Sequence, residues 1–394
     1  MNTVESVVPA GVYEKMVTFR RDLHRHPELS HEEKETAGRI VDELERLGIP
    51  YRTEVGGHGI VADLPGENDD YVVALRSDMD ALPIQEETGL EFASVHDGVM
   101  HACGHDGHTS MLLGAAHLLL QEPSLPAPVR LIWQPAEETG MGAQAMVRDG
   151  AMENVRLIFG GHLDRHYPAG ELIVTEGAVN ASTDAFEIHI RGQQGHGARP
   201  HETVDAVVVG SLFVTALQTL VSREINPAYP SVVTVGTFDA GTAPNVIAGT
   251  ATLTGTIRSQ DAAVREHLLK SLHRMARAIG DLHGAEISVR IHSGTPPVIN
   301  TREMATLARR AAERVVDPDH VRPLVSANMG GEDFAYFLDH AKGCYIRFGA
   351  RVEGREGFPT HSSQFDFDER ALAVGAAWYA EVAKLAGRTL TTGG

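Results

Sequence analysis

The sequence predicts an α/β protein in which a mostly parallel sheet covered by helices is interrupted by a small α+β domain. With 394 residues, the chain is long enough for two domains. Short apolar runs alternate with helical stretches in its first part, as in parallel sheets that are buried on both faces. Between residues 183 and 293 the pattern becomes strand, helix, strand, strand, helix, strand, which is the βαββαβ order of a ferredoxin-like domain.

The N-terminal segment predicts two helices that Pro27 separates. In the second helix apolar residues recur at helical spacing, and Gly48 and Pro50 end it. Apolar runs predict strands at residues 59–64, 71–76, 129–134, 155–160 and 343–349, and a helix is expected at 109–121. We therefore assign residues 1–182 and 294–394 to a catalytic domain and residues 183–293 to a small domain inserted into it.

The acidic composition limits the expected partners. The chain has 34 Lys and Arg against 53 Asp and Glu, a formal net charge of −19. Such a surface repels phosphate backbones and anionic lipids, so we expect neither nucleic acid nor membrane as a partner. No apolar run reaches the length of a membrane span, and the first residues do not resemble a signal peptide. The two cysteines, Cys103 and Cys344, cannot build a disulfide framework. A single bridge is the alternative, but a reducing compartment is the simpler interpretation, so a cytoplasmic location is expected.

Residue types that bind metals follow the predicted strands, at the place where open α/β sheets bind their ligands. Carboxylates and a histidine come directly after three of these strands, namely Asp78, Asp80, Glu137, Glu138 and His162. The loop MHACGHDGHT lies between the first two strands of this set and contains His101, Cys103, His105, Asp106 and His108. Carboxylate, imidazole and thiol groups are therefore expected to meet at one edge of the sheet.

Cys103 and His105 are two residues apart, so in an extended loop both side chains would point to the same side. Thiolate, imidazole and carboxylate together suit zinc best, and manganese, cobalt or nickel also fit. A mixed ligand set leaves coordination positions open, which is typical of catalytic sites. The alternative is a polar loop that only caps the following helix.

The adjacent Glu137 and Glu138 repel each other unless a cation lies beside them. One carboxylate can then bind the metal while the other accepts a proton from water. An exposed acidic turn is the alternative. Arg258, at the end of a predicted strand in the inserted domain, is a candidate for binding a substrate carboxylate, with a plain surface arginine as the alternative.

Motifs distributed over nearly the whole chain carry a family resemblance. In order, they are RRDLHRHPELSHEE, RSDMDALPIQE, MHACGHDGHT, QPAEE, GGH, GQQGHGARPH, APNVI, MGGEDFAYF and HSSQFDFDE. The chain resembles, from about Arg20 to Arg370, the metal-dependent amidohydrolases, which include hippurate hydrolases, N-acyl-amino-acid amidohydrolases and auxin-conjugate hydrolases and are related to carboxypeptidase G. The resemblance implies a dinuclear metallohydrolase domain with an inserted lid or dimerisation domain.

The resemblance also implies a site with two divalent metal ions per subunit. The implied ligands are Cys103, His105, Glu138, His162 and His361. Glu137 takes the role of general base, and Asp80 that of an acid that orients a ligand. Around His162 the sequence departs from the family pattern, which has a hydrophobic residue, a histidine and then a short run to Pro and Gly. Here Asp164 and His166 follow and are plausible ligands in their own right, so the choice among these three stays open at the level of sequence.

In the inserted domain, the resemblance implies two further catalytic or substrate-binding residues. His196 would reach the scissile carbonyl in the active site of the partner subunit, and Asn245 would contact substrate. It therefore implies a homodimer or homotetramer with shared active sites. The alternatives are a turn histidine between glycines and an asparagine that caps a loop.

We therefore expect a metal-dependent hydrolase that cleaves the amide bond of small N-acyl amino acids. A dipeptidase or an N-carbamoyl amino acid hydrolase with the same centre is the alternative. A cysteine hydrolase with Cys103 as nucleophile and His105 or His108 as base is a further possibility, but it leaves the glutamate pair and His361 without a role. A non-catalytic binding protein would need neither the full ligand set nor the base.

Overall fold

The computed structural model describes residues 7–67, 70–354 and 358–392. It divides into two compact units, which we call the catalytic unit (Met1–Val179, Ile299–Ser326 and Asp333–Gly394) and the inserted unit (Asn180–Val298 and Ala327–Glu332). From the sequence we expected the domain boundaries at residues 182/183 and 293/294, whereas the two units divide at 179/180 and 298/299. The sequence did not anticipate Ala327–Glu332, which joins the inserted unit because Arg258 and Gln260 donate hydrogen bonds to the carbonyls of Met329 and Ala327.

The catalytic unit is built on one mixed sheet, in the order β1-β2-β4-β3-β5-β16-β6-β15. Its strands are β1 (Tyr51–Arg52), β2 (Ile60–Leu64), β3 (Val72–Asp78), β4 (Val129–Gln134), β5 (Val155–Pro168), β6 (Leu172–Ile173), β15 (Val321–Arg322) and β16 (Lys342–Arg351). The four central strands, β4, β3, β5 and β16, run parallel, whereas β2 is antiparallel to β4 and β6 is antiparallel to β16. The predicted α/β class with a mostly parallel sheet is confirmed.

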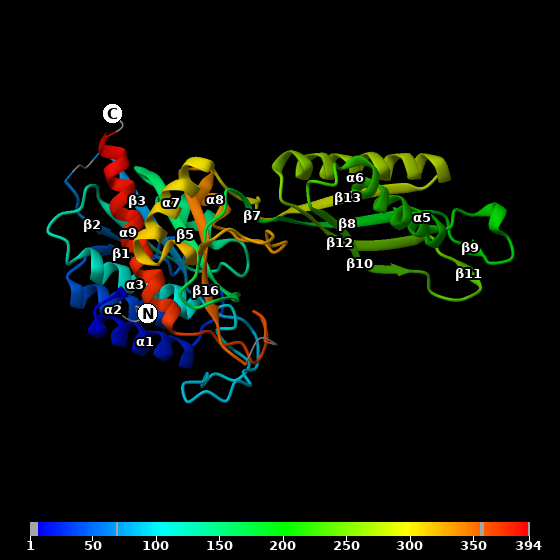
Figure 1. Cartoon of the computed structure of the whole chain (residues 1–394). Coiled ribbons are helices and arrows are strands. Elements are labelled where there is room, and N and C mark those ends of the chain that lie inside the picture. Colours follow the sequence, from blue (N-terminus) through cyan, green and yellow to red (C-terminus); the bar gives the residue numbers. More distant parts are fainter. Residues whose placement is uncertain (1–6, 68–69, 355–357, 393–394) are drawn as a thin grey trace. The chain divides into compact units, whose positions relative to one another are not determined.

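Helices cover this sheet (Figure 1). They are α1 (Ala10–Arg25), α2 (Lys34–Leu47), α3 (His105–Leu119), α4 (Gly142–Arg148), α7 (Arg302–Val315), η4 (Pro318–His320), α8 (Ala335–Leu338) and α9 (Arg370–Thr392). Helix α2 ends as predicted, because Gly48 adopts the left-handed conformation with φ 68°. Helix α3 begins at His105, four residues before the predicted start, so part of the predicted loop is helical.

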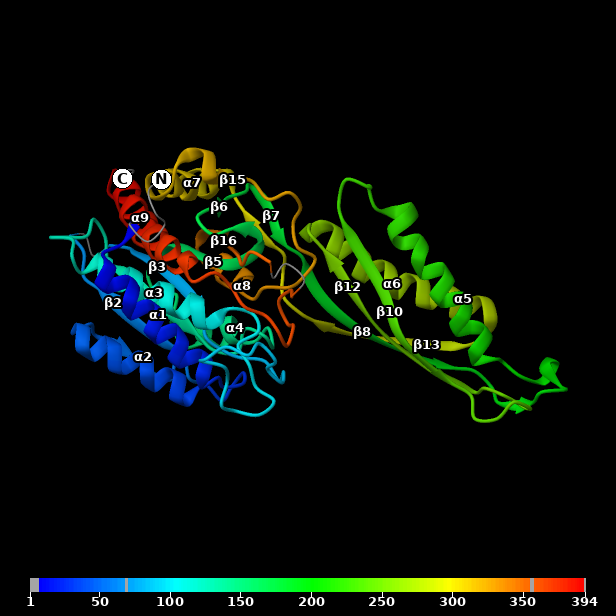
Figure 2. The same ribbon diagram turned by 60° about the horizontal axis from the view of Figure 1, so that its bottom comes forward.

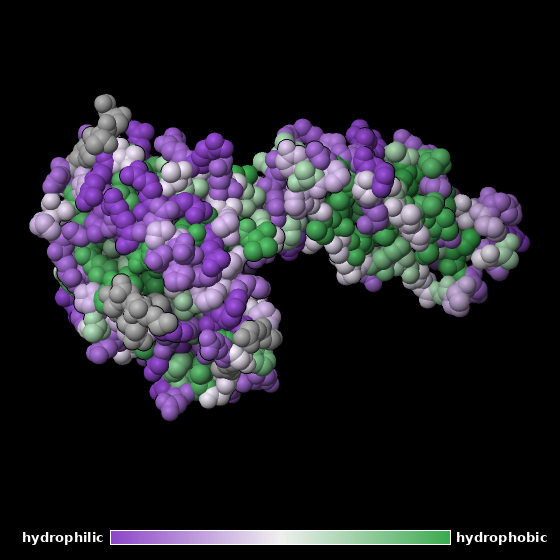
Figure 3. Space-filling view, in the orientation of Figure 1, coloured by the Kyte–Doolittle hydropathy of each residue, from purple (hydrophilic) through white to green (hydrophobic). Residues whose placement is uncertain are grey.

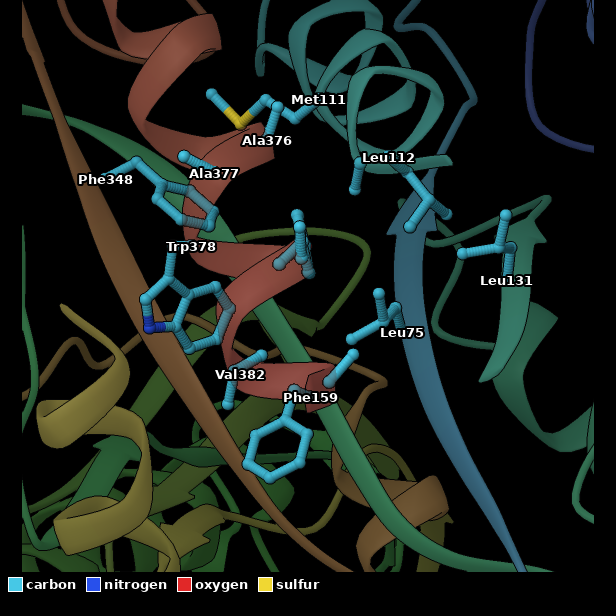
Figure 4. Packing of buried hydrophobic residues seen from close by; sticks show 14 of the residues in the cluster. Leu75, Met111, Leu112, Leu131, Phe159, Phe348, Ala376, Ala377, Trp378 and Val382 are labelled. Carbon is cyan, nitrogen blue, oxygen red and sulfur yellow. The ribbon is translucent and has the colours of Figure 1, made fainter. Parts of the chain in front are cut away.

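The main core lies between the sheet and the pair α3 and α9 (Figure 4). Trp378 of α9 is fully buried, with its ring centroid 5.6 Å from that of Phe348 of β16 and 6.4 Å from that of Phe159 of β5. Next to Phe159 on β5, Gly160 faces the other side of the sheet, where Phe334 occupies the space that a side chain would need. Both faces of β5 are therefore packed, and its residues are held in a fixed register.

Strand β5 is longer than the sequence predicted. The expected strand covered residues 155–160, but pairing with β16 continues as far as Pro168 opposite Arg351. His162, Asp164 and His166 therefore lie within a strand and not in a loop after it. The alternating burial of this part shows one face against the protein and the other toward solvent.

The inserted unit has the predicted βαββαβ order (Figure 2). Its elements are β8 (Ser182–Arg191), β9 (Gly195–His196), η2 (Pro200–Glu202), α5 (Ala206–Thr219), η3 (Leu220–Glu224), β10 (Ser231–Ala240), β11 (Val246–Ile247), β12 (Thr250–Ser259), α6 (Ala262–His283) and β13 (Glu286–Ser293). The antiparallel sheet has the order β10-β12-β8-β13, and β9 pairs with β11 in a separate two-stranded antiparallel sheet. A further pair, β7 (Gly177–Asn180) and β14 (Val298–Asn300), lies where the chain passes between the units.

Helix α5 and its π-helical continuation η3 correct one expectation from the sequence. Together they span Ala206–Glu224, with mean hydropathy 1.5, and are long and apolar enough to cross a membrane, although no such segment was expected. The core helix of a soluble protein passes the same test. Val209, Phe213 and Leu217 of α5 are buried in the core of the inserted unit, and 33% of the apolar stretch is buried in all.

Apolar side chains also gather on the surface of the inserted unit (Figure 3). They come from α5 and from the edge strand β10 and comprise Val207, Val208, Leu212 and Phe238. The two elements are adjacent, since the Phe238 ring occupies the space beside Gly210. We call these four residues the α5–β10 face. Contiguous apolar surface of this kind is typical of contact sites.

Candidate metal centre

All five predicted ligands and the predicted base meet in the catalytic unit. Their ligand atoms form overlapping groups within 4.8 Å of one another, which are Cys103–His105–His162, Cys103–Glu138–His361 and His105–Glu137–Glu138. Residues that are far apart in the chain thus converge at the carboxyl ends of the central strands. This is where open α/β sheets bind their ligands.

One oxygen of Glu138 lies at the middle of the cluster. Glu138 Oε1 is 3.8 Å from His105 Nε2 and 3.5 Å from His361 Nε2. Cys103 Sγ is 3.3 Å from His162 Nε2. Ligand atoms about 2 Å from a common ion lie roughly 3–4 Å apart, so these separations are compatible with a shared cation.

Gly104 sets the directions of Cys103 and His105. It precedes the first residue of α3 and has φ 96°, a left-handed conformation in which a side chain would also meet Leu163. The expectation that the two ligands share one side of an extended loop is therefore wrong. A tight turn into the helix brings them together instead.

His162 joins the cluster from β5, where it pairs with Arg347 of β16. Its Nδ1 lies 2.7 Å from the carbonyl oxygen of Leu163, so Nε2 is left to face Cys103. The two other candidates, Asp164 and His166, contact each other instead. His166 is exposed, and its Nδ1 lies 2.7 Å from Asp164 Oδ1. Neither belongs to a candidate metal group among the residues that the structure describes.

His361 reaches the site through a backbone contact between distant loops. Its N–H donates a 2.7 Å hydrogen bond to the carbonyl of Ala102, next to Cys103. His361 has φ 66°, a conformation that is uncommon for a residue with a Cβ atom. The nearby Ser363 hydroxyl donates a hydrogen bond to Glu87, which is a second contact that holds the same loop in place.

Asp80 orients the cluster. The imidazole Nδ1 of His105 is 2.9 Å from the Asp80 carbonyl oxygen and 3.1 Å from Oδ1, which leaves Nε2 directed toward Glu138. The other carboxylate oxygen, Oδ2, accepts hydrogen bonds from the backbone N–H of Glu138 and from the Ser30 hydroxyl. A carboxylate behind a ligating histidine is a common feature of metal sites.

The residues present fit a divalent metal. His105 Nε2 and Glu138 Oε1 are buried and have no hydrogen-bond partner in the described part of the chain. Buried polar atoms are costly to leave unsatisfied, and a cation between them would satisfy both. The thiol, imidazole and carboxylate groups are all ligand types that zinc and its neighbours accept.

The protein environment by itself disfavours some of the protonation states that metal ligands need. Burial raises the pKa of the Cys103 thiol well above its usual value, and nearby Glu138 raises it further. Burial lowers the pKa of His162 well below normal, whereas Asp78 and Cys103 outweigh burial and raise that of His105. A bound cation would favour the thiolate and neutral imidazoles, so metal binding should release protons.

A buried network beneath the ligands was missed by the sequence analysis. His108 Nδ1 is 2.6 Å from Asp78 Oδ1, and His108 Nε2 accepts a hydrogen bond from the Leu163 N–H. Arg76 donates to Asp78 and also to Asp333, a residue of the MGGEDFAYF motif. Polar residues inside a predicted buried strand, such as Arg76, were the available signal for this network.

Of the three predicted residues of the inserted unit, two lie next to each other and the third lies on another strand. His196 is exposed on β9, and its Nδ1 accepts a hydrogen bond from the Ala198 N–H. Asn245 adjoins β11, and its carbonyl accepts from the N–H of Gly197. These two are therefore neighbours, whereas Arg258 lies on β12 and donates to the carbonyl of Met329.

Fold and site together define a class of protein. A mixed thiolate, imidazole and carboxylate centre at the carboxyl ends of a parallel sheet, with a second glutamate beside it, is the arrangement of a metal-dependent hydrolase. Residues 74–385 match the family model described as peptidase family M20/M25/M40. The chain belongs to this family.

Similar proteins agree with this assignment. The chain is 42% identical over 290 residues to the N-acyl-L-amino acid amidohydrolase of Geobacillus stearothermophilus, covering 73% of this chain and 78% of that protein. It is 38% identical over 375 residues to the N-acetyl-L-cysteine deacetylase of Bacillus subtilis strain 168, covering 94% and 88%. The Bacillus subtilis YXEP protein, described as a dinuclear metal-binding peptidase of the M20 family, superposes with TM-score 0.85 at 34% identity over 97% and 100% of the two chains. The protein is a metal-binding amidohydrolase.

We expect Cys103→Ser to weaken metal binding at least about tenfold, because a neutral hydroxyl is a poorer ligand than a thiolate. Mutation of a residue that only supports a metal ligand already lowers metal affinity by about that factor. Activity should return in part with excess metal. Metal titration of the purified variant measures the effect. Cys344→Ala, in β16 and outside the candidate metal groups, is the matched control. Lost activity at full metal occupancy would favour the nucleophile hypothesis instead.

Proposed function

We propose that this protein hydrolyses the amide bond of N-acyl amino acids and holds two divalent metal ions per subunit on Cys103, His105, Glu138, His162 and His361. The observation that carries the proposal is the placement of Glu137 beside this ligand cluster: one of its carboxylate oxygens lies within 4.8 Å of the ligand atoms of both His105 and Glu138. The names of the relatives, an N-acyl amino acid amidohydrolase and an N-acetylcysteine deacetylase, support this substrate class. Zinc, manganese, cobalt and nickel all suit the donor set.

Each residue of the centre has a separate task in this proposal. The ions, when bound, polarise the scissile carbonyl and lower the pKa of water. Asp80 holds the His105 ring with Nε2 toward the ligand cluster and fixes the Glu138 backbone. Glu137 accepts the proton of the attacking water and returns it to the leaving amine.

The cysteine hydrolase hypothesis receives less support. Burial and Glu138 raise the pKa of the Cys103 thiol, whereas a nucleophilic cysteine needs a lowered pKa. A dipeptidase or an N-carbamoyl amino acid hydrolase remains the alternative, and the description of the YXEP protein as a peptidase favours the dipeptidase. These activities share the centre and differ in the shape of the substrate pocket.

We assign the inserted unit to substrate binding and assembly. His196 is proposed to stabilise the oxyanion, Asn245 to contact substrate, and Arg258 to bind the substrate carboxylate with the N–H groups that Met329 does not occupy. The exposed α5–β10 face is proposed as the contact between subunits of a homodimer, or of a dimer of dimers. Two free cysteines suit a reducing compartment, and we propose a cytoplasmic location.

The activity is tested with a panel of N-acyl amino acids, dipeptides and N-carbamoyl amino acids after metal analysis of the purified protein. The wild type should cleave N-acyl amino acids best, and chelator should abolish turnover. Glu137→Gln should keep the metals, because Glu138 still coordinates, but lower kcat by ~10²–10⁴-fold. A near wild-type kcat in this variant would exclude Glu137 as the base, and faster cleavage of dipeptides would replace the proposed substrate class.

The shared active site is tested by subunit exchange. His196→Ala and Glu137→Gln should each be nearly inactive alone. In a mixed dimer one site inherits both defects and the other inherits none, so activity should reappear. A mixture of Glu137→Gln with Cys103→Ser is the control and should show no more activity than the two variants measured separately, because both residues belong to the catalytic unit. Verified mixed dimers of the first pair without activity would show that His196 acts within its own chain or not at all.

A further inference from the structure

The segment between α1 and α2 contacts the elements that support the glutamate pair. We call this segment, Ser30–Glu33, the N-terminal brace. The Ser30 hydroxyl donates to Asp80 Oδ2 over 2.7 Å. His31 Nε2 lies 3.3 Å from the Thr139 hydroxyl, and Glu33 Oε1 accepts a 2.8 Å hydrogen bond from the backbone N–H of Ala136. The second and third contacts bracket Glu137 and Glu138 in the sequence.

Ala136 is the position at which the chain leaves β4 and turns into the glutamate pair. It is fully buried and has φ 53°, a left-handed conformation that its Cβ atom makes unfavourable. Its carbonyl accepts hydrogen bonds from the Thr139 hydroxyl and the Gly142 N–H, and its N–H donates to Glu33. Hydrogen bonds to both the carbonyl and the N–H of this strained residue thus hold the turn before Glu137.

Apart from Ala136, the hydrogen-bonding groups beside the Glu33 carboxylate in the described part of the chain are backbone groups of its own segment, those of His31 and of Glu33 itself. Its side chain is buried, and Oε2 has no hydrogen-bond partner among the described residues. Although Glu33 precedes the first residue of α2, the carboxylate of Glu28 accepts hydrogen bonds from the first N–H groups of that helix, those of Glu35 and Thr36. Burial also raises the pKa of Glu33. Burying a carboxylic acid costs free energy unless its hydrogen bonds compensate for the lost hydration. The hydrogen bond of Glu33 to the strained turn supplies such compensation.

We infer that Glu33 is a positioning residue for Glu137: its hydrogen bond to Ala136 holds the left-handed turn that directs the base toward the metal ligands. The inference rests on the proposed function of Glu137. Without this acceptor the buried Ala136 N–H has no partner, and the turn is free to relax to an unstrained conformation. The base then moves away from its working position, while the ligands on α3 and β5 stay in place.

Three single variants test the inference. Glu33→Met keeps the length and burial of the side chain but removes the acceptor, so kcat should fall about tenfold to a hundredfold with KM, metal content and Tm little changed. Glu33→Gln keeps an oxygen acceptor and should retain most of the kcat. Glu28→Met removes the hydrogen bonds at the start of α2 and is the structural control, which should lower Tm and spare kcat. An unchanged kcat in Glu33→Met, or an equal loss in Glu28→Met, would overturn the inference.

A double variant and an exchange measurement separate this inference from the proposed function. Glycine adopts a positive φ without strain, so Ala136→Gly should restore much of the kcat of Glu33→Met, and no recovery would count against the positioning role. If the wild type cleaves no substrate of the panel, the proposed function fails. Even then, hydrogen exchange of the residue 136 amide in metal-free protein tests the hydrogen bond between Glu33 and Ala136. The exchange should be at least about tenfold faster in Glu33→Met than in wild type, and equal rates would refute a stabilising role for this hydrogen bond.

Discussion

The carboxylate of Asp80 joins the parts of the centre that come from separate segments of the chain. One oxygen bonds to His105, and the other accepts from the Glu138 backbone and from Ser30. Burial would raise the pKa of Asp80, but the bond and charge of His105 outweigh burial and lower it. An ionised, fully bonded carboxylate therefore fixes the ring of one ligand and the backbone of another. The Glu pair and the Cys-His turn owe their common position to this group.

Buried charges hold the start of α3, where His105 lies. Arg20 of α1 is fully buried and donates to Asp106 over 2.8 Å, and His24 Nδ1 lies 2.9 Å from the same oxygen. The charge of Arg20 and the bond from His24 outweigh burial and keep the pKa of Asp106 far below normal. Removing one partner of such a buried pair costs about 3–5 kcal/mol. The first helix thus supports the metal loop, although it supplies no ligand.

Backbone strain is concentrated at this site. Among the described residues, five other than glycine have positive φ, and three of them, His31, Ala136 and His361, lie in the brace or the two ligand loops. Such conformations cost on the order of 1–3 kcal/mol each and persist only where the surroundings enforce them. Here the enforcing groups are hydrogen bonds to Glu33 and Ala102 and the dense packing of β5 against α9. The rigid core thereby supports an otherwise unfavourable arrangement of ligands.

Local patterns in the sequence determined the α/β class, the βαββαβ insertion and the end of α2 at Gly48, because periodicity and glycine conformation act over a few residues. The types and order of the ligand candidates were also visible, but the choice between His162 and its neighbours was not. That depended on β5 continuing beside β16, a long-range pairing that places His162 against Cys103 and His166 toward solvent. The roles of Arg76, Glu33 and Asp333 were hidden for the same reason. A buried polar group is defined by partners that are distant in the chain, and only the folded chain brings those partners together.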